Sequence, residues 1–285
     1  MVIEQFGKQK IYFDNLSDGK IKTVFKQMKG RKVLVVCSKG NRARIGDCLN
    51  QCGQNKVWFS DFSSNPVYED IKKAVALFLN EQCDSIISLG GGSAIDVAKC
   101  VKAFCNMNEK PEYTKQQISP NAIEHLAIPT TAGTGSESTH FAVLYEKGRK
   151  KSISDPSLLP DYVWLNPAFI KILPSYQKKC TMLDALCQAI ESFWSVRATD
   201  ESKKYASSAI TGILRYAEPY LEECTDKSAE ADILWSANLA GRAIDITQTT
   251  AAHAMSYKLT SNYNIPHGQA VAVCLPGVWK FLISN

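Results

Sequence analysis

The chain has 285 residues, of which 45% are hydrophobic and 21% are charged. This balance is typical of a soluble globular protein, and the length predicts two domains rather than one. The N-terminus lacks a basic start followed by a long apolar core, and no apolar run approaches the length of a membrane span. We therefore expect a cytoplasmic protein without a membrane partner.

Charge and cysteine content exclude two further classes of protein. The net charge is +5, but the basic residues are spread among 28 acids and do not alternate with aromatic residues, so we expect no nucleic-acid partner. The ten cysteines include no CxxC pair, and most lie in apolar strand or helix patterns, where cysteine behaves as a small hydrophobe. A reducing compartment fits this pattern better than a disulfide framework.

The first half of the chain alternates short β-branched runs with amphipathic stretches, which predicts a parallel sheet with crossover helices. The expected strands are 33–37, 57–59, 85–89, 125–129 and 162–165. The expected helices are 42–52 and 67–80. A hairpin is expected from 141–145 and 152–154, with its turn at 146–148.

After Pro174 the pattern becomes helical, with long stretches at 178–196, 203–216 and 229–250. We place the boundary between domains near 166–174, which gives an α/β domain over 1–170 and an all-helical domain over 171–285. The apolar stretch 271–284 reads as a further helix or pair of helices that stops without a cap or polar tail. We expect the helical domain to be incomplete at its C-terminus.

A glycine-rich turn follows the strand expected at 85–89. Gly90, Gly91 and Gly92 allow the backbone to approach a ligand closely, and Ser93 marks the start of a helix whose free N–H groups suit phosphate. A simple tight turn is the alternative interpretation. A second loop follows the strand at 125–129 and carries the hydroxyls of Thr130, Thr131 and Thr134 beside two glycines.

Two pairs of side chains in the helical half have the spacing of a metal site. Asp184 and Gln188 lie four residues apart, so on a helix both point to one face. His253 and His267 are two of only four histidines, and a neutral imidazole suits iron or zinc.

Taken together, these segments resemble the iron-containing, or group III, alcohol dehydrogenases, relatives of lactaldehyde reductase and glycerol dehydrogenase. The matching motifs are GGGSAIDVAK, IPTTAGTGSE, SISDPSLLPDYVWLNP, LDALCQAIESFWS and HAMSYKLTSNYNIPHG, which together span most of the chain. The resemblance implies a dehydroquinate synthase-like architecture, with a Rossmann-like N-terminal domain and an all-α C-terminal domain. It also implies an oxidoreductase that acts on small alcohols and aldehydes.

The resemblance implies a divalent metal, Fe2+ or Zn2+, held by Asp184, Gln188, His253 and His267. The family uses one Asp and three His at these positions, so Gln188 is a departure, and its neutral oxygen is a weaker ligand than imidazole. Tyr257 replaces a family histidine thought to relay protons. We expect Tyr257 and His267 to be catalytic, although a core tyrosine is an equally good interpretation of Tyr257.

The cofactor implied by the resemblance is NADP or NAD. Its expected binding residues are Ser38, Lys39, Gly90, Gly91, Gly92, Ser93, Asp96, Thr130, Thr131, Thr134 and Lys150. Ser38, at the end of the first expected strand, takes the place of an acid that would repel a 2′-phosphate, and Lys39 and Arg42 are close by in sequence, so NADP is slightly favoured.

Within the family, the segment from 137 to 143 and the helix around 184–196 look most like the branch that reduces phosphonoacetaldehyde. A dianionic substrate needs cations, and His140, Phe141, Arg197 and Lys258 are the substrate candidates, with Arg242 as a further cation. Reduction of another small aldehyde, of the lactaldehyde or butanal type, is the alternative. A truncated nucleotide-binding relative without activity is another. The resemblance also suggests a homodimer or larger assembly.

Overall fold

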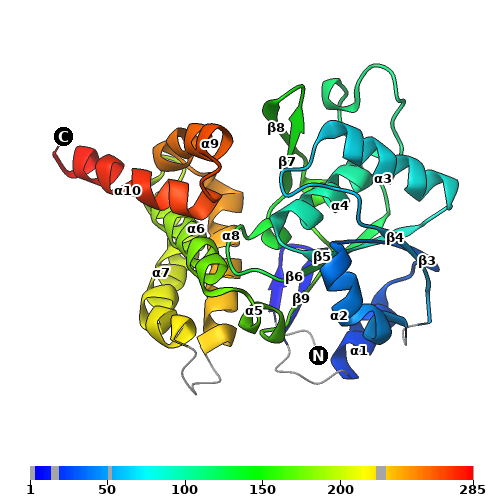
Figure 1. The fold of residues 1–285 in the computed structure, drawn as a ribbon, viewed down its shortest axis with the longest axis horizontal. Coiled ribbons are helices and arrows are strands. Elements are labelled where there is room, and N and C mark those ends of the chain that lie inside the picture. The colour runs from blue at the N-terminus through cyan, green and yellow to red at the C-terminus, as the bar shows by residue number, and fades with distance from the viewer. Residues whose placement is uncertain (1–3, 14–18, 51–52, 223–228, 285) are drawn as a thin grey trace. The chain divides into compact units, whose positions relative to one another are not determined.

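The computed structural model describes residues 4–13, 19–50, 53–222 and 229–284 (Figure 1). The chain divides into two compact units. The first, here called the sheet unit, comprises Met1–Thr130 and Thr139–Asn166. The second, the helical unit, comprises Thr131–Ser138 and Pro167–Asn285. Residues 131–138, assigned from the sequence to the α/β half, therefore group with the helices.

The sheet unit is built on a seven-stranded sheet with the order β1-β2-β9-β6-β5-β3-β4. Its strands are β1 (Glu4–Phe6), β2 (Gln9–Phe13), β3 (Lys32–Cys37), β4 (Asn55–Phe59), β5 (Ser85–Gly90), β6 (Glu124–Pro129) and β9 (Tyr162–Leu165). All neighbours pair in parallel except β1 with β2. The expected strands and the parallel sheet are confirmed, whereas β1 and β2 were not predicted.

Helices and a hairpin complete the sheet unit. The helices are α1 (Gly19–Gln27), α2 (Lys39–Asn50), α3 (Tyr68–Asn80) and α4 (Gly92–Phe104). Residues 51–52 of the expected helix 42–52 lie outside the described residues. The hairpin of β7 (Phe141–Glu146) and β8 (Arg149–Ser154) forms as expected, and it turns at Lys147 and Gly148, which both have positive φ. The apolar faces of α3 and α4 pack into one core with β3, β5 and β7. Nearly all residues of β3 and β5 are buried, which explains why these two strands read as continuous apolar runs.

The helical unit contains α5 (Ala168–Lys171), α6 (Ser175–Trp194), α7 (Asp200–Leu221), α8 (Ala229–Thr247), α9 (Ala251–Tyr263) and α10 (His267–Ser284). The expected helix over 229–250 ends at Thr247, because Gln248 adopts a positive φ of 66°. Asn264 ends α9 in the left-handed conformation, with φ of 54°. Pro266 then precedes the first residue of α10, which is His267.

The loop 131–138 packs against α8 through two glycines. Gly135 has φ of +59°, and a Cβ placed on it would lie 2.4 Å from the Cα of Gly241. Polar side chains hold the end of the loop, because Nδ2 of Asn238 donates to Oε1 of Glu137 at 3.1 Å and to Oγ of Ser138 at 2.6 Å. The loop therefore lies backbone to backbone with α8.

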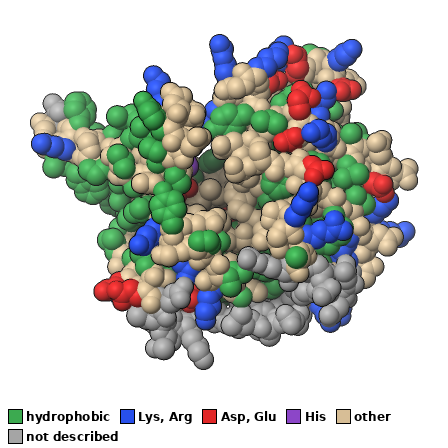
Figure 2. Space-filling model, in the orientation of Figure 1, with side chains coloured by type: hydrophobic (Ala, Val, Ile, Leu, Met, Phe, Trp, Pro, Cys, Tyr) green, Lys and Arg blue, Asp and Glu red, His purple; other side chains and the backbone are tan. Residues whose placement is uncertain are grey.

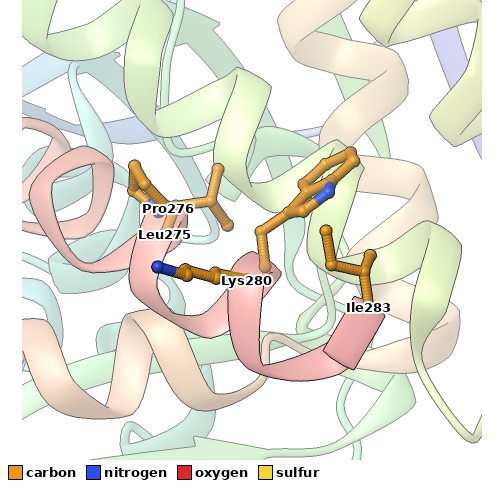
Figure 3. Close-up of a pocket in the computed structure, with 5 residues that line it drawn as sticks. Leu275, Pro276, Lys280 and Ile283 are labelled. Carbon is orange, nitrogen blue, oxygen red and sulfur yellow. The ribbon is translucent and has the colours of Figure 1, made fainter. Parts of the chain in front are cut away.

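The two ends of α10 differ in their packing. At its start, a Cβ on Gly268 would lie 1.9 Å from the carbonyl oxygen of Cys180, so α10 meets the backbone of α6 closely. Toward its other end, Figure 2 shows hydrophobic side chains gathered over the helix. Phe281 and Ile283, near this end of α10, are exposed. A groove of about 330 Å³ lies on this distal part of α10 (Figure 3). Its lining residues are Leu275, Pro276, Trp279, Lys280 and Ile283.

None of the helices in the described ranges is long and apolar enough to cross a membrane.

The contact at Gly268 generates a stability prediction. Gly268→Ala should lower the free energy of unfolding by about 1–3 kcal/mol, because the added methyl group meets a backbone carbonyl that cannot rotate away. Gly277→Ala is the matched control on the same helix, since a Cβ there has no atom within 4 Å, and it should raise stability by about 0.5–1 kcal/mol. Urea unfolding measures both. Equal effects of the two substitutions would contradict this account of the α6–α10 contact.

Candidate functional site

Three helices of the helical unit bring together the residues expected to hold a metal. Asp184 and Gln188 lie one above the other on α6, His253 is in the first turn of α9 and His267 begins α10. One ligand atom each from Asp184, His253 and His267 lies within 4.8 Å of the others. Nε2 of His253 is 3.4 Å from Oδ1 of Asp184, and Nε2 of His267 is 3.9 Å from the same oxygen.

Gln188 lies one turn from Asp184 on α6. Its Nε2 donates to the carbonyl oxygen of Thr134 at 3.3 Å, which occupies the amide nitrogen. Its Oε1 is buried and has no hydrogen-bond partner among the described residues. The amide nitrogen of Gln188 is therefore hydrogen-bonded, whereas its oxygen is a buried acceptor without a hydrogen bond among the described residues.

Glu191, one turn beyond Gln188 on α6, fixes the ring of His253. Its carboxylate is fully buried and pairs through Oε2 with Nδ1 of His253. Burial pushes the pKa of Glu191 upward, but hydrogen bonds from His253 and Thr250 prevail and lower it, so the group is ionised. A neutral His253 therefore carries its proton on Nδ1, which leaves the lone pair of Nε2 facing Asp184.

The arrangement fits a divalent ion. Nε2 of His253 makes no hydrogen bond, although Oδ1 of Asp184 lies only 3.4 Å away. Two acceptors that face each other at this distance require a cation or a proton between them. Burial lowers the pKa of His253, yet the carboxylates of Asp184 and Glu191 outweigh it and raise the pKa to about 9. Two imidazole nitrogens, a carboxylate and an amide oxygen form a donor set suited to Fe2+ or Zn2+.

Three other residues of the helical unit, Tyr257, Lys258 and Arg197, were expected to act on the substrate. The ring of Tyr257 stacks on that of His267, with centroids 6.0 Å apart and an interplanar angle of 15°. Lys258 is exposed on α9. Arg197 lies beyond the end of α6, and its guanidinium donates to Oε1 of Gln248 at 3.0 Å.

Arg242 has a structural environment that the sequence did not indicate. Its side chain is fully buried on α8, where Nε donates to Oδ1 of Asn238 at 3.0 Å. The guanidinium also lies 5.0 Å from the ring centroid of Trp235 and 5.6 Å from that of Tyr205. The expectation that Arg242 could contact a substrate is wrong, because the side chain forms part of the core that supports the loop 131–138.

In the sheet unit, the glycine turn lies at the carboxyl edge of the parallel strands. Gly90 ends β5, and its carbonyl accepts from the backbone N–H of Thr130 at 3.0 Å, which joins the ends of β5 and β6. A Cβ on Gly90 would lie 2.7 Å from the Cβ of Ala94, so a side chain is excluded. Gly91 precedes α4 without a side-chain cap, which leaves the first N–H groups of the helix for an anion.

Ser38 and Lys39 lie at the same edge, at the end of β3. Cys37 pairs with Leu89 in the register of β3 with β5, so Ser38 follows β3 beside the strand end that carries the glycine turn. Both side chains are exposed, and Oγ of Ser38 accepts from the backbone N–H of Asn41 at 3.2 Å. These two residues, Gly90–Gly92 and Thr130 are thus brought to one edge of the sheet.

The remaining residues that were expected to bind cofactor or substrate differ in their contacts and exposure. Asp96 accepts from the backbone N–H of Val143 at 3.2 Å, so its carboxylate supports the hairpin. Ser93 donates to the carbonyl of Ser64, and Lys150 is exposed on β8. The rings of His140 and Phe141 meet edge to face at 5.8 Å. In the loop of the helical unit, Thr131 is half-buried and Oγ1 of Thr134 accepts from the backbone N–H of Ser136 at 3.3 Å.

Sequence reasoning missed Glu191. A signal for it was present, because Asp184, Gln188 and Glu191 follow the i, i+4, i+7 spacing of a single helix face. The carbonyl oxygen of Thr134 was also missed, and no side-chain pattern marks a backbone acceptor.

Two models of one protein family match the two halves of the chain. The family model described as iron-containing alcohol dehydrogenase matches residues 8–167, and the model of the C-terminal part of the same family matches residues 179–285. A phosphonoacetaldehyde reductase of Streptomyces viridochromogenes is 33% identical over 211 residues, which cover 70% of this chain and 53% of the relative. The chain thus spans about half the length of this curated relative.

Two solved structures share the fold. A 1,3-propanediol oxidoreductase superposes with a TM-score of 0.90 and 27% identity, covering 96% of this chain and 75% of that one. A sulfoacetaldehyde reductase from Bifidobacterium kashiwanohense, in complex with NAD+, superposes with a TM-score of 0.86 and 26% identity, covering 95% and 74%. These likenesses confirm the expected architecture of an α/β unit followed by helices. The chain belongs to the iron-containing alcohol dehydrogenase family.

Proposed function

We propose that this chain is a metal-dependent, NAD(P)H-linked aldehyde reductase and that phosphonoacetaldehyde is its substrate. The observation that carries the proposal is the group of Asp184, His253 and His267, whose ligand atoms lie within 4.8 Å of one another, with Gln188 one turn from Asp184 on the same helix. The family supports the reaction class, since its members named above are oxidoreductases and reductases.

Each residue of the group has a proposed part. Asp184, His253 and His267 would hold Fe2+ or Zn2+, and Gln188 would add its Oε1. A bound ion of this kind supplies Lewis acidity that polarises a carbonyl oxygen toward hydride attack. Tyr257, stacked on His267, is the proposed hydrogen-bond donor to the substrate oxygen. Burial of Asp184, Gln188 and His253 keeps water from competing for these polar atoms.

The sheet unit would hold the nucleotide. We propose that the pyrophosphate binds at Gly90–Gly92 and the N-terminus of α4, and that Ser38 and Lys39 contact the ribose. A serine in place of an acid leaves room for a 2′-phosphate, and the lysine attracts it, which favours NADP over NAD. The related sulfoacetaldehyde reductase was solved with NAD+, so the preference has to be measured.

The proposed substrate rests on two relatives that reduce aldehydes of similar chemistry. Phosphonoacetaldehyde and sulfoacetaldehyde are both two-carbon aldehydes with a strongly anionic group. In the helical unit, the exposed Lys258 lies five residues after His253 on α9 and is the cation we propose for the anionic group. His140 and Phe141 remain proposals for the sheet unit.

An aldehyde panel tests the substrate. The Fe2+- or Zn2+-loaded protein should reduce phosphonoacetaldehyde with kcat/KM at least about tenfold above lactaldehyde and butanal, since a hydrogen bond to a charged group contributes about 1.5–3 kcal/mol. NADPH oxidation gives the rates. Higher kcat/KM with the uncharged aldehydes would replace the phosphonate assignment with a simple alcohol dehydrogenase activity.

Substitution of Gln188 tests its part in the metal site. Gln188→His should tighten binding of Zn2+ about tenfold, because imidazole is the better ligand, and should lower kcat/KM for phosphonoacetaldehyde. Chelator competition measures the affinity, and His140→Ala is the matched control, which should leave metal affinity unchanged because it alters a histidine of the sheet unit. An unchanged affinity in Gln188→His would show that this side chain does not reach the ion.

Ser38→Asp tests the nucleotide assignment. The new carboxylate should raise KM for NADPH by about tenfold or more and leave KM for NADH unchanged or lower, because it repels only the 2′-phosphate. Steady-state rates with both nucleotides provide the measurement. A proportional loss with both would place Ser38 away from the ribose.

A further inference from the structure

We infer that Glu191 is a positioning residue: it holds His253 in the one ring orientation and tautomer that presents Nε2 to the metal. This inference rests on the proposed metal site, and it concerns a residue outside the expected ligand set. Three observations in the helical unit support it.

The first observation is the number of donors that converge on the Glu191 carboxylate. Oε1 lies within hydrogen-bond distance of the backbone N–H groups of Thr250, Ala252 and His253, at 3.2, 2.9 and 3.4 Å. The hydroxyl of Thr250 donates to the same oxygen at 2.7 Å. Glu191 on α6 therefore caps the N-terminus of α9, where no side chain of α9 itself provides a cap.

The second observation is that the other oxygen is used differently. Oε2 pairs with Nδ1 of His253, so one carboxylate grips both the backbone and the ring of the same residue. A backbone bond fixes where the residue sits, and the ring bond fixes its rotation. Because a carboxylate only accepts, Nδ1 has to be the protonated nitrogen of the neutral ring.

The third observation is the direction of the remaining nitrogen. Nε2 of His253 is buried, makes no hydrogen bond and lies 3.4 Å from Oδ1 of Asp184. Asp184 and Glu191 are two turns apart on the same face of α6, so the imidazole spans from one carboxylate to the other. Partners of this kind orient metal-bound histidines and raise their basicity.

Glu191→Gln separates positioning from folding. The amide oxygen can still accept from the N-terminus of α9, so the cap is retained. The amide nitrogen takes the place of Oε2 and donates to Nδ1, which moves the ring proton of a neutral His253 to Nε2. The variant should bind Zn2+ or Co2+ about 10- to 100-fold more weakly, with NADPH binding unchanged.

The measurement is chelator competition with Zn2+, together with the visible absorption of the Co2+-loaded protein, which reports the ligand set without turnover. Glu201→Gln is the matched control, because it replaces another acid of the helical unit by its amide, in the first turn of α7, and it should leave metal affinity unchanged. In the unsubstituted protein, 15N NMR of Zn2+-loaded His253 should show a proton on Nδ1 and the metal on Nε2. The NMR measurement needs no variant, so it decides the assignment even if Glu191→Gln unfolds.

The outcomes distinguish this inference from the proposed function. If the parent protein binds the ion and Glu191→Gln binds it equally well, or if the ring is protonated on Nε2, the positioning role is overturned and the metal site stands. If the parent binds no divalent ion, the metal site and the role of Glu191 both fail. A selective loss of metal affinity in Glu191→Gln, with the expected tautomer in the parent, supports the inference.

Discussion

The buried carboxylate of Glu191 is the contact on which the arrangement of the helical unit depends most. It joins α6 to the start of α9, and the start of α9 carries the histidine that faces Asp184. A second contact, where Gly268 meets the carbonyl of Cys180, brings the start of α10 to an earlier part of α6. The N-termini of α9 and α10 are thus both fixed against α6.

The contact at Glu191 is polar, whereas the contact at Gly268 is steric. Glu191 satisfies N–H groups that would otherwise be orphaned at a buried helix end. Gly268 contributes nothing polar, and its value is the absence of a side chain at a position where any carbon would overlap a backbone oxygen. Beneath them, a small apolar cluster of Cys187, Ala252 and Val271 joins the same three helices. Close approach is possible because the residues at the contacts are small.

Much of the fold could be predicted from the sequence, because the strands of the parallel sheet are buried on both faces and read as apolar runs. The same reasoning failed for β1 and β2. Strand β2 pairs with β9, about 150 residues away in sequence, and its own sequence is not a continuous apolar run. The spacing of Asp184 and Gln188 indicated directly that these two side chains share one face of a helix. It could not reveal that Gln188 is turned by the carbonyl of Thr134, because a contact between a side chain and distant backbone leaves no periodicity. Arg242 was misread for a similar reason: burial among aromatic rings depends on neighbours that only the fold brings together.

The grouping of residues 131–138 with the helices has a consequence for recombining members of this family. The segment sits between two stretches of the sheet unit in sequence, yet its glycine backbone lies against α8 and its acid and serine are held by Asn238. A chimaera cut only near residue 166 would pair the loop of one parent with the α8 of another. If the other parent carries a larger residue at the position of Gly241, the backbone of the loop would meet its side chain. The exchangeable unit is the helical half together with this eight-residue loop, so a viable crossover design needs three junctions rather than one.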